Sequence, residues 1–113
     1  MFDLDQLFQK GNLIPVIIQD VETREVLMLG FTNKEAVELT LKTGTAWFWS
    51  RSRQKLWNKG ETSGNFLHVV EMRTDCDTDT LLYLCWPDGP TCHTGARSCF
   101  FNEIPMNGKD DVP

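Results

Sequence analysis

Residues 13–31 read LIPVIIQDVETREVLMLGF and carry the clearest secondary-structure signal in the chain. LIPVIIQD and REVLMLGF are apolar runs of strand length, and the turn around 21–24 between them is mostly polar. Two such runs joined by a short polar segment are typical of neighbouring antiparallel strands. The stretch therefore predicts a β-hairpin.

Downstream of this hairpin, the sequence predicts one main helix. Thr32 and Glu35 have capping-box spacing ahead of AVELTLK, and Gly44 stands where a helix end needs a positive φ. A helix is therefore expected over about 33–42. The residues before the hairpin predict only short helical turns.

Three further segments are rich in β-branched and aromatic residues at strand length, namely TAWFWS, NFLHVVEM and DTLLYLCW. In the second of them, His68 is expected at the edge of the core. The expected fold class is α+β, mostly β-strands with one or two helices. A single small domain covers 1–113, and its polar residues 107–113 are expected to form a frayed tail.

Composition limits the partners and the compartment. The chain has 113 residues, 41% of them hydrophobic, and a formal net charge of −5, which disfavours nucleic-acid binding. The first residues do not resemble a signal peptide, and no apolar run approaches the roughly 20 residues of a membrane helix. We therefore expect a cytoplasmic protein without nucleic-acid or membrane partners. The abundant Trp and Phe in so small a domain favour a homodimer.

The four cysteines divide into two kinds. In a reducing compartment they are expected to be metal ligands, nucleophiles or core residues rather than disulfides. Cys76, Cys92 and Cys99 have polar or turn-forming neighbours, whereas Cys85 lies within LLYLCW and is assigned to packing. Three protein ligands and one water are typical of a catalytic zinc site. The spacing C-x15-C-x6-C matches no zinc finger, so on spacing alone three ordinary thiols remain an alternative.

Several long blocks resemble the phosphoribosyl-AMP cyclohydrolases. They are GFTNKEAVELTLKTGTAWFWSRSRQKLWNKGETSGN, DCDTDTLLYL and GPTCHTGARSCF, in this order, across about 30–101. The resemblance implies hydrolytic opening of the adenine ring of 1-(5-phosphoribosyl)-AMP between N1 and C6, a step of histidine biosynthesis. Some relatives carry a second, pyrophosphohydrolase domain, and we expect only the cyclohydrolase step here.

The resemblance also implies the cofactors and the assembly. It implies that zinc is bound by Cys76, Cys92 and Cys99, at sites formed between the two subunits of an intertwined homodimer. It further implies that magnesium is bound by Asp75, Asp77 and Asp79. If the backbone is extended there, these alternating carboxylates share one side, and magnesium prefers such oxygen ligands. Without the resemblance, these carboxylates would indicate an acidic turn with calcium or magnesium affinity at best.

Ring opening of this substrate requires a proton-transfer residue and a phosphate-binding segment, and the sequence offers candidates for both. His93 adjoins Cys92, and an imidazole is a common general acid or base, so it is the candidate catalytic residue, with a surface imidazole as the alternative. Trp57 either stacks on the base or packs in the core. A basic run with hydroxyl residues suits the two substrate phosphates, unless it is only a solvated face. Its predicted substrate-binding residues are Arg51, Arg53, Lys55, Lys59, Thr62 and Ser63.

Two other functions compete with ring opening. A zinc base deaminase would carry H-x-E with P-C-x-x-C, but His93 is followed by Thr94 and Gly95. A non-catalytic zinc module for dimerisation or nucleic-acid binding would have a closed fourth ligand and a basic surface, and neither is apparent. Both rivals are therefore disfavoured.

Overall fold

The computed structural model describes residues 2–106, and the predicted hairpin forms one half of its main sheet. Strands β1 (Ile14–Asp20) and β2 (Val26–Thr32) are antiparallel, with Ile14 opposite Thr32. In β1, Ile14, Val16 and Ile18 are buried in alternation, as a strand with one face on the core requires. The hairpin prediction is confirmed.

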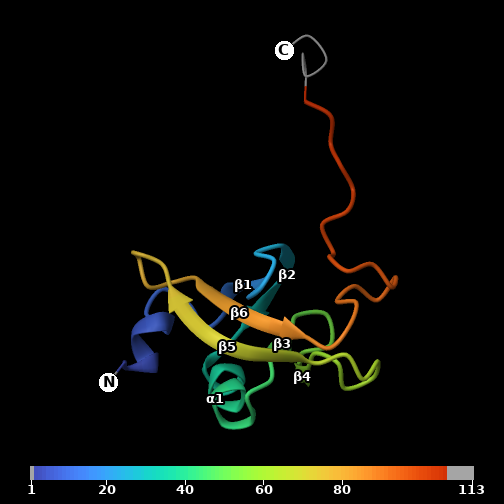
Figure 1. The fold of residues 1–113 in the computed structure, drawn as a ribbon. Coiled ribbons are helices and arrows are strands. Elements are labelled where there is room, and N and C mark those ends of the chain that lie inside the picture. The colour runs from blue at the N-terminus through green and yellow to red at the C-terminus, as the bar shows by residue number, and fades with distance from the viewer. Residues whose placement is uncertain (1, 107–113) are drawn as a thin grey trace.

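The other half of this sheet is formed by β5 (Leu67–Thr74) and β6 (Leu81–Pro87). The strand order is β2-β1-β6-β5, as Figure 1 shows. β6 pairs antiparallel with β5 and parallel with β1. Parallel neighbours need a long crossover connection. The helix and a small second sheet, formed by β3 (Trp47–Ser50) and β4 (Lys55–Asn58), lie within that crossover.

Residues 2–106 contain two helical segments, as predicted: the short 3-10 helix η1 (Leu4–Phe8) and the helix α1 (Lys34–Thr43). Gly44 ends α1 with φ 80°, and its N–H donates to the Thr40 carbonyl. The capping-box prediction at Thr32 was wrong by one residue. The Asn33 side chain caps the helix and accepts from the Ala36 N–H at 2.9 Å, because Thr32 is still paired with Ile14 in the hairpin.

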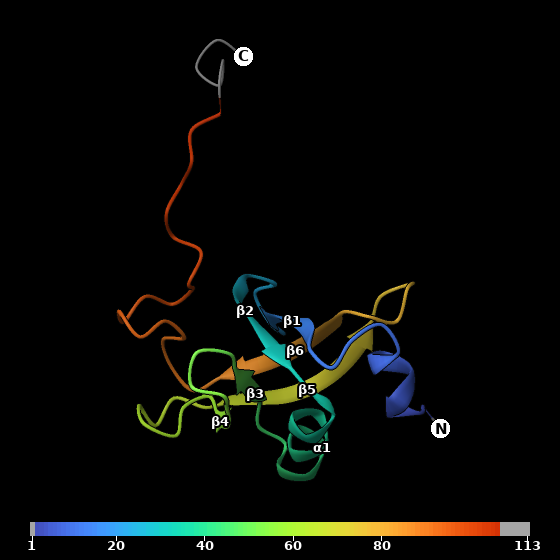
Figure 2. The same ribbon diagram turned by 180° about the vertical axis from the view of Figure 1, so that it is seen from behind.

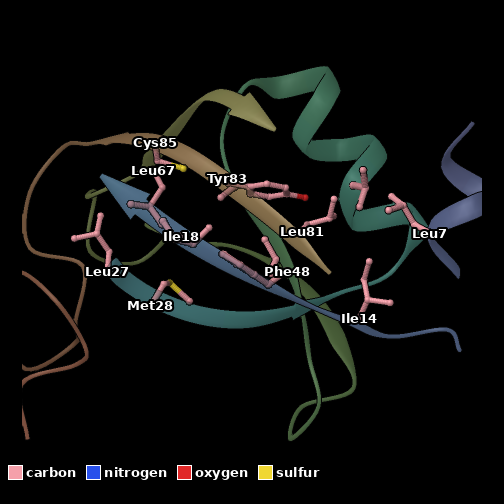
Figure 3. Close-up of a cluster of buried hydrophobic side chains, with 13 residues drawn as sticks. Leu7, Ile14, Ile18, Leu27, Met28, Phe48, Leu67, Leu81, Tyr83 and Cys85 are labelled. Atoms are coloured by element: carbon pink, nitrogen blue, oxygen red, sulfur yellow. The ribbon is translucent and has the colours of Figure 1, made fainter. Parts of the chain in front are cut away.

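The core lies between the main sheet, α1 and β3 (Figure 3). Phe48 of β3 is buried and packs on β2 at Gly30, where a Cβ would come within 2.6 Å of the phenyl ring. Cys85 is fully buried beside Tyr83, so its assignment to packing is confirmed. Burial raises the pKa of its thiol to about 12.

The prediction for His68 was wrong. Leu67 takes the buried position in β5, so strand alternation directs His68 outward. Its Nε2 lies 2.9 Å from Asp88 Oδ1 at the surface.

Strands predominate, with α1 as the α-helix, so the α+β class is confirmed for the described residues. No helix within 2–106 is long and apolar enough to cross a membrane. The predicted frayed tail, 107–113, lies outside the described residues.

Candidate active site

A cavity of about 640 Å³ forms where the basic run meets the segment after β6. Its walls come from residues between 53 and 65 and from residues between 90 and 95. Five of the predicted site residues line it together with Cys92, namely Arg53, Lys59, Thr62, Ser63 and His93. The structure therefore brings together the predicted proton-transfer residue and much of the predicted phosphate-binding segment.

The antiparallel pairing of β5 with β6 brings together the two segments that form the cavity walls, 53–65 and 90–95. It does so because it places the start of β5 beside the end of β6. The Asp88 N–H donates to the Phe66 carbonyl at 3.0 Å, and the Phe66 N–H donates to the Asp88 carboxylate at 3.2 Å. Gly60 has φ 103°, and a Cβ there would lie 2.6 Å from the Asn65 carbonyl oxygen. A glycine is therefore needed at this close approach.

Two cavity residues that sequence reasoning missed are Asn58 and Thr91. Asn58 Oδ1 and Thr91 Oγ1 are buried and have no hydrogen-bond partner among residues 2–106. Buried polar atoms in native proteins are normally paired, so a ligand group at this place would satisfy them. Their positions beside Trp57 and Cys92 are the only sequence signal that could have pointed to them.

Two of the three predicted zinc ligands also meet at this end of the sheet. The thiols of Cys92 and Cys99 are close enough that each shifts the pKa of the other. The Thr94 hydroxyl donates to Cys92 Sγ at 3.1 Å and lowers the pKa of that thiol. Burial, followed by the neighbouring Cys92, raises the pKa of Cys99. Two adjacent sulfur atoms suit a soft ion such as zinc, but they leave its coordination incomplete.

The third predicted ligand, Cys76, lies at the opposite end of the sheet. It belongs to the turn between β5 and β6, whereas Cys92 follows β6 (Figure 1 and Figure 2). The seven residues of β6 separate the two places by about 20 Å at the rise of a β-strand. One chain therefore does not gather the three thiols around a single ion.

The three aspartates do gather, in the turn that holds Cys76. Ligand oxygens of Asp75, Asp77 and Asp79 lie within 4.8 Å of one another, the only such group of three or more metal-ligating side chains within 2–106. The backbone of this segment is not extended, because Thr78 has φ 57° and the chain turns there. Asp75 Oδ1 accepts from the N–H groups of Asp79 and Thr80, which hold the pKa of that carboxyl below its ordinary value.

The remaining basic residues lie outside the cavity walls. The Arg51 guanidinium stands 3.8 Å from the centre of the Phe31 ring, and Lys55 is exposed in β4. β4 itself was not predicted, because its residues KLWN stand inside a run that reads as a loop. The Trp57 ring centre lies 5.3 Å from that of buried Phe48, and Trp57 also lines the cavity. Its stacking on the base stays a prediction.

Comparison with known proteins connects this site to a family. The family model described as phosphoribosyl-AMP cyclohydrolase matches residues 28–101, which include both cavity segments and all four cysteines. A phosphoribosyl-AMP cyclohydrolase of Archaeoglobus fulgidus is 62% identical over 97 residues, covering 86% of this chain and 90% of the relative. One from Cenarchaeum symbiosum is 56% identical over 98 residues, covering 86% and 91%.

A longer relative is similar over about half of its own length. The histidine biosynthesis bifunctional protein HisIE of Lactococcus lactis is 57% identical over 104 residues, which are 91% of this chain and 49% of the relative. The family match extends across the cavity, the thiol pair and the acidic turn, and together with these identities it shows that the chain belongs to the phosphoribosyl-AMP cyclohydrolase family.

Proposed function

We propose that this chain opens the adenine ring of 1-(5-phosphoribosyl)-AMP by adding water at C6 and breaking the N1–C6 bond, as a step of histidine biosynthesis. Family membership and the names of the relatives support the reaction. The observation that carries the proposal is the cavity in which His93 and Cys92 face a basic, hydroxyl-rich loop. Such a cavity offers a proton-transfer group next to groups that hold phosphate.

Within the cavity, the residues divide by chemistry. Arg53 and Lys59 supply positive charge, and Thr62 and Ser63 supply hydroxyl donors, for the two phosphates of the substrate. His93 moves a proton when N1 departs as the leaving group. The unpartnered oxygens of Asn58 and Thr91 hydrogen-bond to the substrate inside the cavity.

Zinc is held by Cys92 and Cys99 of one chain and Cys76 of a second chain. The support is that the first two thiols are adjacent, while β6 holds Cys76 at the far end of the sheet. Zinc held by these three thiolates would supply a water of lowered pKa as the nucleophile. A two-fold dimer would form two such sites, because each surface meets the same surface of the partner.

Exposed apolar surface supports this homodimer. Ile17 of β1 pairs with Leu29 on one side and Leu82 on the other, on the sheet face opposite the core. On this face, Leu29 is 46% exposed. Residues 100–106 run away from the sheet and expose further large apolar side chains, namely Phe100, Phe101, Ile104 and Met106 (Figure 1 and Figure 2). Apolar surface of this kind marks an interaction site.

Magnesium is held by the aspartates of the acidic turn. Asp75 and Asp77 flank Cys76, so a dimer that brings Cys76 to the partner's thiols also brings these carboxylates to the partner's cavity. Magnesium commonly joins carboxylates to substrate phosphates. This arrangement explains why an acidic cluster accompanies a cavity that binds an anionic substrate.

The test is an assay of the purified chain with 1-(5-phosphoribosyl)-AMP, before and after chelation. We expect ring opening without release of ammonia, loss of turnover in chelator and recovery when zinc and magnesium are returned. Stoichiometric ammonia would instead identify a base deaminase. Zinc binding without turnover of this substrate would identify a non-catalytic module.

A further inference from the structure

Arg97 lies between Cys92 and Cys99 in sequence, but its side chain contacts the hairpin turn. Its Nη2 donates to Asp20 Oδ2 at 2.6 Å and to Thr23 Oγ1 at 3.1 Å. Its Nε donates to the Glu25 carboxylate. The guanidinium thus binds three oxygen acceptors in the turn between β1 and β2.

Asp20, the central acceptor, is a buried carboxylate that is fixed within the hairpin, not an exposed surface acid. Its side chain is 5% exposed. Oδ1 accepts from the N–H groups of Glu22 and Thr23, which leaves Oδ2 for Arg97. Burial opposes the charged form of Asp20, but these two N–H groups and Arg97 outweigh it and lower the pKa of the carboxyl. The Asp20 carboxylate is therefore held in one orientation, with Oδ2 directed at Arg97.

The residues around Arg97 attach the thiol segment to the same hairpin. The Ser98 hydroxyl donates to the Val26 carbonyl at 2.7 Å, and the Cys99 N–H donates to the Leu27 carbonyl at 2.8 Å. Toward Cys92, the Ala96 carbonyl accepts from the Cys92 N–H and the Arg97 carbonyl accepts from the Thr91 N–H. A shift of Arg97 would therefore move both thiols.

We propose that Arg97 is a positioning residue of the metal site, which holds the Cys92–Cys99 segment against Asp20 so that both sulfurs reach one soft metal ion. The inference rests on the proposed zinc site and deepens it. Groups that orient metal ligands typically contribute about 10- to 100-fold to metal affinity. Arg97 contacts no ligand sulfur in the described residues and acts through the backbone that it anchors.

The experiment titrates cobalt(II) into the full-length protein and follows the thiolate-to-cobalt charge-transfer absorption. This signal reports sulfur ligation and is silent for metal bound only by the acidic turn. For Arg97→Met we expect about 10- to 100-fold weaker cobalt binding. Arg97→Lys should recover part of the loss, because one ammonium can replace only some of the guanidinium bonds. Arg73→Met is the matched control, since it breaks an exposed pair with Glu71 in β5.

A second variant separates positioning from stability. Arg97→Met leaves a buried carboxylate without its cation, which destabilises the fold. Asp20→Asn combined with Arg97→Met removes that charge and keeps a side-chain oxygen that accepts from the N–H groups of the turn. If Arg97 positions the thiols, the double variant regains thermal stability but not cobalt affinity. Recovery of both together, or normal affinity in Arg97→Met, overturns the proposal while the zinc site stands. Absence of the sulfur band in the wild-type protein overturns the zinc site and this inference with it.

Discussion

Lys10 Nζ lies 3.1 Å from Asp79 Oδ2, so an ammonium group contacts the acidic turn that is proposed to bind magnesium. The contact joins the segment after η1 to the turn between β5 and β6. Asp79 raises the pKa of Lys10, first through the hydrogen bond and then through its charge, with smaller contributions from Asp77 and Asp75. Lys10 is therefore charged at neutral pH and competes with a cation for this carboxylate.

For Lys10→Met we expect tighter magnesium binding, by about two- to fivefold, because exposed ion pairs are individually weak. Calorimetric titration of magnesium measures the change, and the magnesium dependence of turnover should shift in the same direction. Lys34→Met is the control, since Lys34 pairs with Asp5 and not with the acidic turn. Equal or weaker magnesium binding in Lys10→Met would contradict the competition.

For the cysteines we expect a division between ligands and packing. Cys76→Ser, Cys92→Ser and Cys99→Ser should each lose zinc and turnover, because three thiolates are needed to hold the ion. Cys85→Ala should keep its zinc, since that thiol is buried in the core with a raised pKa. Zinc per subunit, measured by elemental analysis, decides each case. Full zinc retention in one of the three serine variants removes that residue from the site.

His93→Ala should keep the fold and the zinc but lose turnover by on the order of a hundredfold, the usual effect of removing a general acid–base group. His93 lines the cavity next to Cys92 and is exposed, so its removal leaves the core intact. The measurement is kcat in protein whose zinc content equals that of the wild type. A kcat close to the wild-type value would make His93 a bystander.

Alanine variants of Arg51 and Arg53 provide a matched comparison, because the two side chains lie in different environments. Arg53 lines the cavity, whereas Arg51 stacks on Phe31. We expect Arg53→Ala to raise KM about tenfold, because a charge-assisted bond to phosphate is lost. Arg51→Ala should raise KM less. Steady-state kinetics of both variants provide the test, and the reverse order would place the phosphate outside the cavity.

The interface site predicts complementation between two inactive proteins. In the proposed dimer, each zinc site would take Cys76 from one chain and Cys92 with Cys99 from the other. A mixed dimer of Cys76→Ser and Cys99→Ser would then have one intact site of two. Random pairing makes about half of the dimers mixed, and refolding the two variants together should restore about a quarter of wild-type activity. A refolded wild-type sample and a tagged chain control for recovery and exchange. No recovery despite confirmed exchange would mean that the thiols come from one chain.

Local chemistry was sufficient to predict much of the fold. The hairpin of β1 and β2, the end of α1 at Gly44 and the burial of Cys85 depend on periodicity and backbone preferences within a few residues. The same reasoning failed where two neighbours competed for a role. Thr32 and Asn33 are both good helix caps, and only the pairing of Thr32 with Ile14 leaves the cap to Asn33.

The candidate site was predictable as a set of residue types, because thiols, carboxylates, an imidazole and a basic run each imply a ligand chemistry. Which of them meet was decided by tertiary structure. The pairing of β5 with β6 carries His93 to Lys59, a turn at Thr78 rather than an extended strand gathers the aspartates, and Arg97 reaches Asp20 across 77 positions of sequence. These contacts join distant segments, so no local pattern encodes them. The length of β6 likewise keeps Cys76 from Cys92 within one chain, a separation that depends on strand geometry and not on the spacing of cysteines in the sequence.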